Sequence, residues 1–76
     1  MTRAEWEALV EYTLNIGRQM MECGAEAWRA ENTMARIFRA YDLEVLDAHV
    51  IATQAAVTVK TPTGEHYTST CMILPD

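Results

Sequence analysis

Residues 55–73 read AAVTVKTPTGEHYTSTCMI, and this stretch decides the fold. Small or β-branched residues alternate with polar ones on both sides of the triplet Pro62-Thr63-Gly64. Proline presets φ for a turn and glycine tolerates positive φ, so the triplet predicts a tight connection between two antiparallel strands. The register of the hairpin is expected to follow four cross-strand pairs: Thr61 with Glu65, Val59 with Tyr67, Val57 with Ser69 and Ala55 with Cys71.

A further strand is expected directly before this hairpin, between Val45 and Ala52 (VLDAHVIA). Beyond Leu43, β-branched residues replace the helix formers, and apolar residues recur with the period of two that a strand requires. The face expected to be apolar carries Leu46, Ala48, Val50 and Ala52. The opposite face carries Val45, Asp47, His49 and Ile51. Together with the hairpin, this strand predicts a three-stranded antiparallel meander.

Two amphipathic helices are predicted in the first half of the chain. The first begins at a capping box formed by Thr2 and Glu5, and it ends at Gly24. The second runs to Tyr41 and is followed by Asp42, where Gly or Asn more often ends a helix. These elements predict one α+β domain, residues 1–76, with two antiparallel helices packed on a three-stranded antiparallel meander sheet. The core is expected to include Met34, Ile37, Phe38, Val50, Val57 and Val59.

Length and composition exclude several classes of protein. Seventy-six residues, half of them hydrophobic, suffice for one small core but not for a second domain. Eleven acidic against six basic residues give a net charge of -5, which argues against a nucleic-acid partner because phosphate contacts need Lys and Arg. The sequence has no secretion signal and no run of about 18 apolar residues, so we expect a soluble chain in a reducing compartment.

One acid and imidazole pair offers catalytic chemistry. Asp47 and His49 point to the same side of a strand, so the carboxylate can orient the imidazole as a base or ligand. No nucleophile follows from the spacing, and a polar outer sheet face is the simpler interpretation. A small hydrolase-like domain that also uses Glu26 or Glu31 stays open as an alternative. Zinc is not expected, nor any other metal or cofactor, because the available donors lack paired spacing: Cys23, Cys71, His49 and His66.

The second helix carries a basic ridge, which we define as Arg29, Arg36 and Arg39. Steps of three and seven residues keep these side chains on one face, together with Asn32. A solvated helix face is the simpler interpretation. The alternative is a docking surface for headgroups or for an acidic neighbour.

The stretch from Gly24 to Leu43 (GAEAWRAENTMARIFRAYDL) resembles the N-terminal signature of the threonine/serine exporter family. In that signature, Gly-Ala-Glu and two variable residues precede Arg-Val-Glu and an amphipathic helix. The matching positions are Gly24, Ala25, Glu26, Arg29 and Glu31. The departures are Ala30 in place of Val, Asp42 in place of Gly, and Thr53-Gln54-Ala55 in place of a Pro/Gly turn. The order of helices, strand and hairpin extends the likeness over nearly the whole chain.

The same motif also has a structural interpretation. Gly24 closes the first helix, and Glu26 in the first turn of the second helix meets the positive end of the helix dipole. Arg29 lies three residues further on, within pairing distance of Glu26. An exposed pair of this kind contributes only about 0–1 kcal/mol, so a functional reason for the cluster stays open.

The resemblance implies a secondary transporter in which a soluble cytoplasmic region precedes a bundle of membrane helices, in one polypeptide or in two. It implies that this chain is the N-terminal cytoplasmic domain of an exporter of amino acids or small organic acids. Such a domain would lie at the cytoplasmic side of a bacterial or archaeal cell membrane. It would act in assembly or gating rather than conduction, with the transmembrane part of the exporter as its partner. A free-standing interaction module is the remaining alternative.

Self-association is expected from the open edges of the sheet. In a meander the first and third strands are the edges. The first carries Asp47 and His49 but no lysine, and the third ends in the uncharged segment Cys71–Leu74. Because little blocks these edges, we expect an isologous homodimer rather than a monomer.

Overall fold

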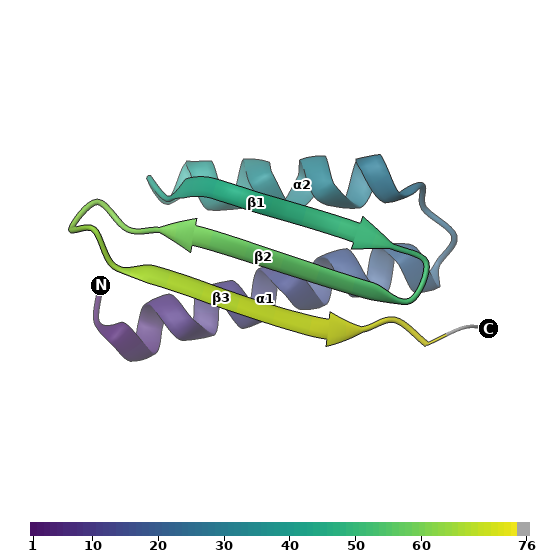
Figure 1. Cartoon of the computed structure of the whole chain (residues 1–76), viewed down its shortest axis with the longest axis horizontal. Coiled ribbons are helices and arrows are strands. Elements are labelled where there is room, and N and C mark those ends of the chain that lie inside the picture. The colour runs from purple at the N-terminus through teal and green to yellow at the C-terminus, as the bar shows by residue number, and fades with distance from the viewer. Residues whose placement is uncertain (75–76) are drawn as a thin grey trace.

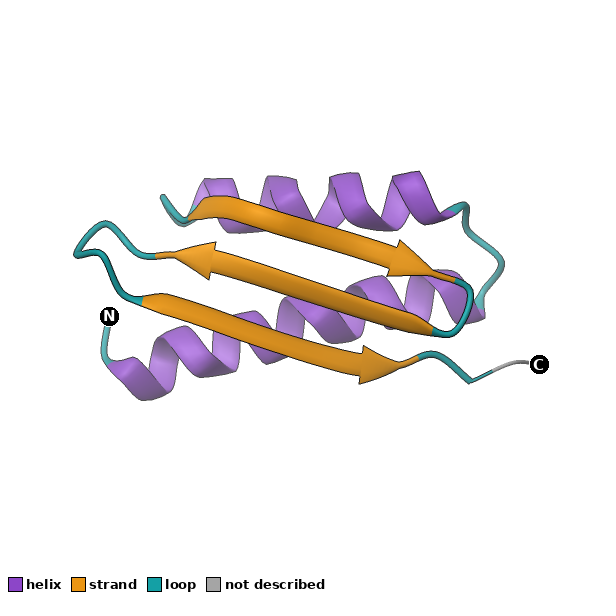
Figure 2. Ribbon diagram, in the orientation of Figure 1, coloured by secondary structure: helices purple, strands orange, loops and turns teal. Residues whose placement is uncertain are grey.

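The computed structural model describes residues 1–74 and has the expected α+β architecture. Two helices lie side by side on one face of a three-stranded antiparallel sheet, whose other face is uncovered (Figure 1). The strands follow one another in the order β1-β2-β3, so β1 and β3 are the edges (Figure 2). In chain order the elements are α1 (Arg3–Glu22), α2 (Ala27–Ala40), β1 (Glu44–Ile51), β2 (Gln54–Lys60) and β3 (His66–Met72).

Local sequence determines where α1 begins and where both helices end. The Thr2 hydroxyl accepts from the amide of Glu5 at 3.1 Å, and the Glu5 carboxylate accepts from the amide of Thr2 at 2.7 Å, which confirms the capping box. Gly24, with φ of 92°, follows α1, and the amide of the next residue reaches back to the carbonyl of Met20. Asp42, with φ of 63°, has the same left-handed conformation after α2, and the amide of Leu43 reaches back to the carbonyl of Phe38. Both helices therefore end in a Schellman motif.

The hairpin register is confirmed at every predicted pair. Val59 lies opposite Tyr67, Val57 opposite Ser69 and Ala55 opposite Cys71. The amide of Thr61 donates to the carbonyl of Glu65 at 2.8 Å, which closes the turn. The Thr61 hydroxyl also accepts from the amide of Glu65 at 3.0 Å, so this side chain fixes the turn from inside.

The predicted faces of β1 are wrong in its first half. A β-bulge lies between Val45 and Asp47, since Val45 pairs with Val59 whereas Asp47 pairs with the adjacent residue Thr58. The extra residue, Leu46, turns to solvent and is 46% exposed, while Val45 packs against the core. A bulge shifts the period of two by one residue, so the two side chains exchange faces. Ala52 is also exposed, because β1 ends at Ile51.

The core lies between the sheet and the two helices. Met34, Phe38, Val57 and Val59 are wholly buried and Val50 nearly so, as expected. Ile37 is instead half-buried at the surface of α2.

The burial of three other apolar residues does not follow from residue type or from the local pattern. Trp28, which suits a core-rim position by its size, is 56% exposed. Ile73 lies in the uncharged C-terminal segment but is only 5% exposed and packs in the core. Leu14, which the helical pattern alone does not single out, is 1% exposed.

The two helices approach closely at Gly17. A Cβ built on Gly17 would lie 2.5 Å from the sulfur of Met34, which is wholly buried. Glycine at this position therefore allows α1 and α2 to pack side by side on the sheet.

Opposite stability changes are expected from substitutions at the two helix ends. Asp42→Gly removes the steric cost of a left-handed side-chain-bearing residue and should stabilise the fold by about 0.5–1 kcal/mol. Gly24→Ala introduces that cost, although no atom lies within 4 Å of the added Cβ, and should destabilise by about 1 kcal/mol. Urea unfolding measures both changes. A loss of stability in Asp42→Gly would show that the side chain, and not the backbone, holds this helix end.

Candidate functional site

The five family-motif residues lie at the junction of the two helices and on the first turns of α2. Gly24 and Ala25 form the link, Glu26 is the N-cap of α2, and Arg29 and Glu31 lie within that helix. A shallow surface hollow is lined by the first four of these residues with Met20 and Cys23. The motif thus divides into residues that face this hollow and Glu31, which does not line it.

Glu26 and Arg29 form no ion pair with each other, contrary to expectation, within residues 1–74. The indole N–H of Trp28 donates instead to the Glu26 carboxylate. The Arg29 guanidinium lies over the Trp28 ring, 5.1 Å from its centroid. Trp28 therefore separates the acid from the base and contacts both. All three side chains are exposed, which leaves the motif charges accessible to a partner.

Glu31 binds the sheet. Its carboxylate accepts a hydrogen bond of 2.8 Å from the backbone amide of Val50 in the edge strand β1. Hydrogen-bonded pairs alternate along an antiparallel ladder. Thr61–Glu65 and Thr53–Ile73 are bonded pairs, so the odd-numbered residues of β2 bond to β3 and the even-numbered ones bond to β1. Val50 lies opposite Ala55, an odd-numbered residue, and its N–H therefore points away from β2. Glu31 therefore satisfies an edge amide that would otherwise point to solvent and joins α2 to β1. Sequence reasoning missed this role.

The basic ridge lies on solvent-exposed positions of α2. Arg29, Arg36 and Arg39 are all exposed, as is Asn32 between them. The two ion pairs among the described residues, Arg3–Glu7 and Arg18–Glu22, both lie on α1. The charges of the ridge are therefore not neutralised within residues 1–74.

The residues of the hydrolase alternative are distributed over separate surfaces. Asp47 and His49 are both exposed on β1, and no hydrogen bond joins them within the described chain. A groove between α2 and β1 is lined by Asp47 and Glu31 but not by His49. Glu26 lies in the other hollow, at the opposite end of the motif. The structure thus brings only Asp47 and Glu31 to one groove.

The two cysteines and two histidines also lie apart. Cys23 is an exposed free thiol that follows α1, whereas Cys71 is a half-buried free thiol on β3. Burial raises the pKa of the Cys71 thiol. His49 and His66 are exposed on the two edge strands. No group of three or more His, Cys, Asp and Glu side chains suited to a metal occurs within residues 1–74.

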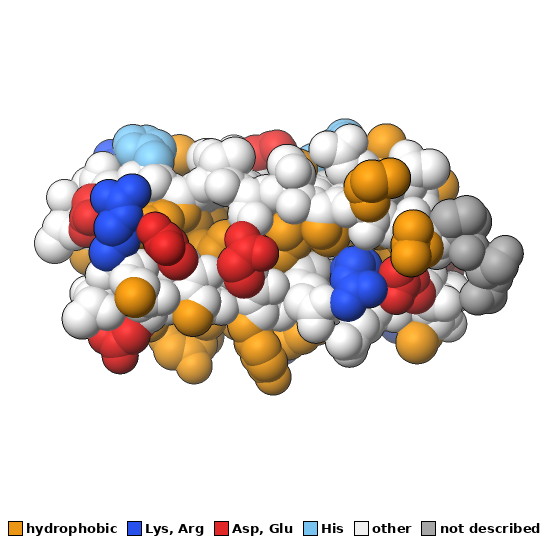
Figure 3. Space-filling view, turned by 90° about the horizontal axis from the view of Figure 1, so that it is seen from below, with side chains coloured by type: hydrophobic (Ala, Val, Ile, Leu, Met, Phe, Trp, Pro, Cys, Tyr) orange, Lys and Arg blue, Asp and Glu red, His pale blue; other side chains and the backbone are white. Residues whose placement is uncertain are grey.

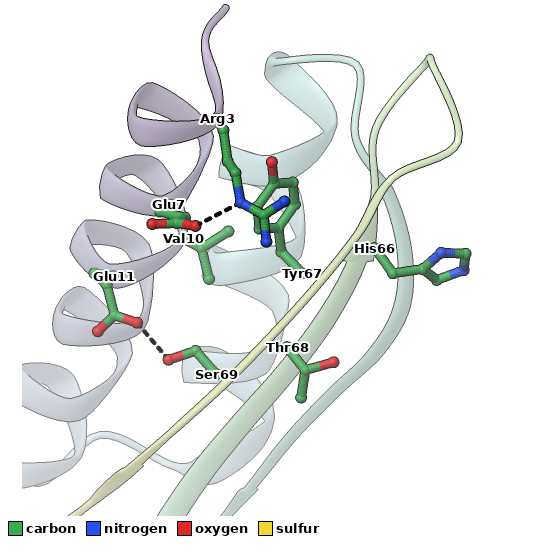
Figure 4. Close-up of a pocket in the computed structure, with 8 residues that line it drawn as sticks. All are labelled: Arg3, Glu7, Val10, Glu11, His66, Tyr67, Thr68 and Ser69. Atoms are coloured by element: carbon green, nitrogen blue, oxygen red, sulfur yellow. Dashed lines mark hydrogen bonds and ion pairs between the residues drawn. The ribbon is translucent and has the colours of Figure 1, made fainter.

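A groove between α1 and β3 contains polar residues that sequence reasoning did not single out (Figure 4). Arg3 pairs with Glu7 at 3.1 Å and lies over the ring of Tyr67, and the Ser69 hydroxyl donates to Glu11. Tyr67 is 8% exposed, and its hydroxyl has no hydrogen-bond partner among the described residues. The available sequence signal was the spacing of four residues from Arg3 to Glu7 and from Glu7 to Glu11.

Burial raises the pKa of the Tyr67 hydroxyl, and the nearby Glu65 carboxylate acts in the same direction. The hydroxyl therefore stays neutral at physiological pH. Figure 3 shows this side of the molecule, where charged side chains of both signs follow one another along its length. Polar contacts at the rim of the groove, from Arg3 to Tyr67 and from Ser69 to Glu11, join α1 to β3.

Comparison with known families agrees with the motif. A family model of threonine/serine exporters (ThrE) matches residues 11–75 of the 76. The chain belongs to the threonine/serine exporter family. The match starts within α1 and includes α2 and all three strands, so it confirms the resemblance carried by Gly24–Glu31. No curated protein and no solved structure matches the chain. Within residues 1–74, neither helix combines the length and the apolar character needed to span a membrane.

Removal of the Glu31 carboxylate should weaken the fold in a way that removal of Glu26 does not. Glu31→Ala leaves the Val50 amide without its charged acceptor and is expected to cost about 1–3 kcal/mol. Glu26→Ala is the matched control from the same motif, and at this exposed site, where the side chain makes no cap bond, we expect a change below about 0.5 kcal/mol. Urea unfolding gives both values. Hydrogen exchange should also show faster exchange of the Val50 amide in Glu31→Ala only. Equal effects of the two substitutions would contradict the assigned role.

Proposed function

We propose that this chain is the N-terminal cytoplasmic domain of a threonine/serine exporter and acts in assembly or gating rather than in conduction. The family match over residues 11–75 carries the proposal. The packed interior supports the part of the proposal that assigns no conduction to this chain, because Phe38, Met34 and Val57 fill the space between helices and sheet. Solute sites of secondary transporters lie between membrane-spanning segments. Conduction is therefore assigned to the transmembrane part, which is the proposed partner.

The exposed part of the family motif is the proposed contact with that partner. Glu31 is engaged by the sheet, which gives it a structural role. Glu26 and Arg29 are exposed on either side of Trp28, and they border the hollow that follows α1. An acid, an indole and a guanidinium at fixed positions can bind a complementary loop through charge-assisted hydrogen bonds and stacking. This cluster is proposed to orient the domain on the transporter.

Export should fall when the exposed motif charges are neutralised together. In Glu26→Gln/Arg29→Gln the net charge and the fold are retained, but both charged contacts are lost. We expect the efflux of labelled threonine or serine from cells that depend on this exporter to fall about fivefold or more. Arg3→Gln/Glu7→Gln is the matched control, since it removes an exposed acid and base from α1 and should leave export unchanged.

The abundance of the transmembrane part distinguishes the two proposed roles. Reduced abundance in the membrane fraction indicates assembly, whereas normal abundance with slow efflux indicates gating. If the motif variant exports at the wild-type rate, the proposed contact is wrong. If ester or phosphoester turnover by the purified chain is lost in His49→Ala, a hydrolase replaces the exporter proposal.

We further propose that the chain forms an isologous homodimer through the C-terminal part of β3. The ladder alternation directs the backbone N–H groups of Thr70 and Met72 away from β2, and neither has a partner within residues 1–74. The corresponding amide of Val50 on β1 is occupied by Glu31. Beyond the end of β3 the Leu74 amide is likewise taken, by the Glu22 carboxylate at 3.4 Å, so the amides of Thr70 and Met72 form the open part of the β3 edge.

The position of α1 limits where a second copy can pair. This helix contacts β3 and extends past its edge beside the first half of the strand, then passes behind the sheet toward the strand's C-terminal end, where the Glu22 carboxylate accepts from the amide of Leu74 at 3.4 Å (Figure 1). Packed helices need about 8–10 Å between axes, whereas paired strands are about 4.8 Å apart. Two copies paired along the first half of β3 would therefore bring their α1 helices too close together. Pairing centred on Met72 avoids this overlap. It also covers two exposed side chains, Met72 at 73% and Leu74 at 65% exposure.

A lysine at the centre of the proposed dimer should abolish it. Met72→Lys places two like charges at the twofold axis and should give a mass near 8.6 kDa at all concentrations in sedimentation equilibrium. Ile51→Lys is the matched control, because Ile51 is 45% exposed in the same row of the sheet but on the β1 edge. It should dimerise as the wild type does. A wild-type chain that stays monomeric at millimolar concentration contradicts the proposal.

A further inference from the structure

The charges of this acidic chain are unevenly distributed. Helix α2 carries three arginines and one glutamate, whereas the remainder of the chain carries three basic and ten acidic residues. The single acid of α2, Glu31, accepts the Val50 amide and so is directed to the sheet. The exposed surface of α2 is therefore locally cationic between two bordering acids, Glu26 at its N-cap and Asp47 in the groove beside Arg39, in a molecule whose net charge is -5.

Exposed aromatic residues lie at both ends of α2. Trp28 in the first turn is 56% exposed, and Tyr41 at the C-cap is 49% exposed. Arg29 stacks on the Trp28 ring, so the two side chains present one combined surface. Arginine beside Trp and Tyr is the composition that favours the headgroup region of a membrane, where an aromatic ring is partly apolar and the guanidinium binds phosphate.

We propose that the basic ridge, with Trp28 at its end, docks on anionic phospholipid headgroups. The ridge lies on the α2 face that points away from the core, so docking would hold the helix layer against the membrane with the open face of the sheet turned away. Guanidinium groups bind phosphate in a bidentate geometry. Each cationic side chain near an anionic surface raises the partition coefficient about fivefold at low salt. This inference goes beyond the proposed exporter function, because it requires lipid alone.

The remainder of the surface makes the docking oriented and sensitive to salt. The side formed by α1 and β3 carries charges of both signs (Figure 3), and the lining of its groove includes two acids, Glu7 and Glu11, beside Arg3. Their repulsion from an anionic membrane opposes any orientation that brings this side close. Attraction through the ridge is screened within about 10 Å at 0.1 M salt, so binding should disappear at high ionic strength.

Tryptophan fluorescence with lipid vesicles tests the proposal. Trp6 is 9% exposed and serves as an internal reference, whereas Trp28 is open to solvent. Vesicles of equal parts phosphatidylglycerol and phosphatidylcholine should shift the emission to shorter wavelength, and brominated lipid should quench it. Vesicles of phosphatidylcholine alone should have no effect. The shift should vanish in 0.5 M salt, roughly a 3–5 Å screening length, and in Trp28→Phe.

A pair of charge-matched variants separates the ridge from net charge. Arg36→Gln/Arg39→Gln should lower the partition coefficient about 25-fold, since two cations of the ridge are lost. Arg3→Gln/Lys60→Gln lowers the net charge equally from other surfaces and should bind within about twofold of the wild type. Circular dichroism checks that both variants fold.

Three outcomes would overturn the proposal. One is absence of a shift with anionic vesicles, and another is an equal loss of binding in the two double variants. The third is a shift with polyglutamate but not with vesicles, which would identify an acidic protein as the partner. None of these results bears on the export assay, so the lipid and exporter proposals fail separately.

Discussion

The fold depends on the burial of one face of the central strand. Ala55, Val57 and Val59 are each wholly buried beneath the helices, and they alternate with residues that face the open side of the sheet. A slip of one residue would turn all three to water and bring their polar neighbours into the core. The turn at Pro62–Gly64 holds β3 in register with this strand, and the contact at Gly17 lets the two helices lie close enough to cover it.

Features encoded by adjacent residues could be predicted from the sequence. The hairpin register follows from a turn triplet and two alternating patterns, all within residues 55–73, and the capping box needs only Thr2 and Glu5. Features that depend on distant partners could not. The bulge at Leu46 arises from pairing with β2, and the bond from Glu31 to Val50 joins residues 19 positions apart. A helical wheel also gives the angular position of a side chain but not its degree of burial, so it could not show that Ile37 lies at the surface.

In the family motif, Gly24–Glu31, spacing also failed to predict which side chains contact one another. Spacing alone suggests that Glu26 pairs with Arg29, because three residues separate them on one helix. In the structure Glu26 is the N-cap, and the indole of Trp28 takes its carboxylate. Trp28 occupies one of the variable positions of the signature, so the family pattern does not point to it. Gly24 and Glu31 maintain the junction and the sheet edge, and the exposed residues between them are free to contact a partner.

The proposed dimer and the proposed lipid contact constrain each other through symmetry. Antiparallel pairing of β3 with a second β3 generates a twofold axis normal to the joined sheet, which keeps the helices of both copies on one face. Both ridges then point in the same direction, and one flat membrane can engage them together. Binding of the first ridge raises the effective concentration of the second, so a weak contact per copy becomes stronger in the pair without any new interaction. A twofold axis within the sheet plane would instead direct the ridges to opposite sides. The direction of the twofold axis therefore determines whether self-association strengthens docking.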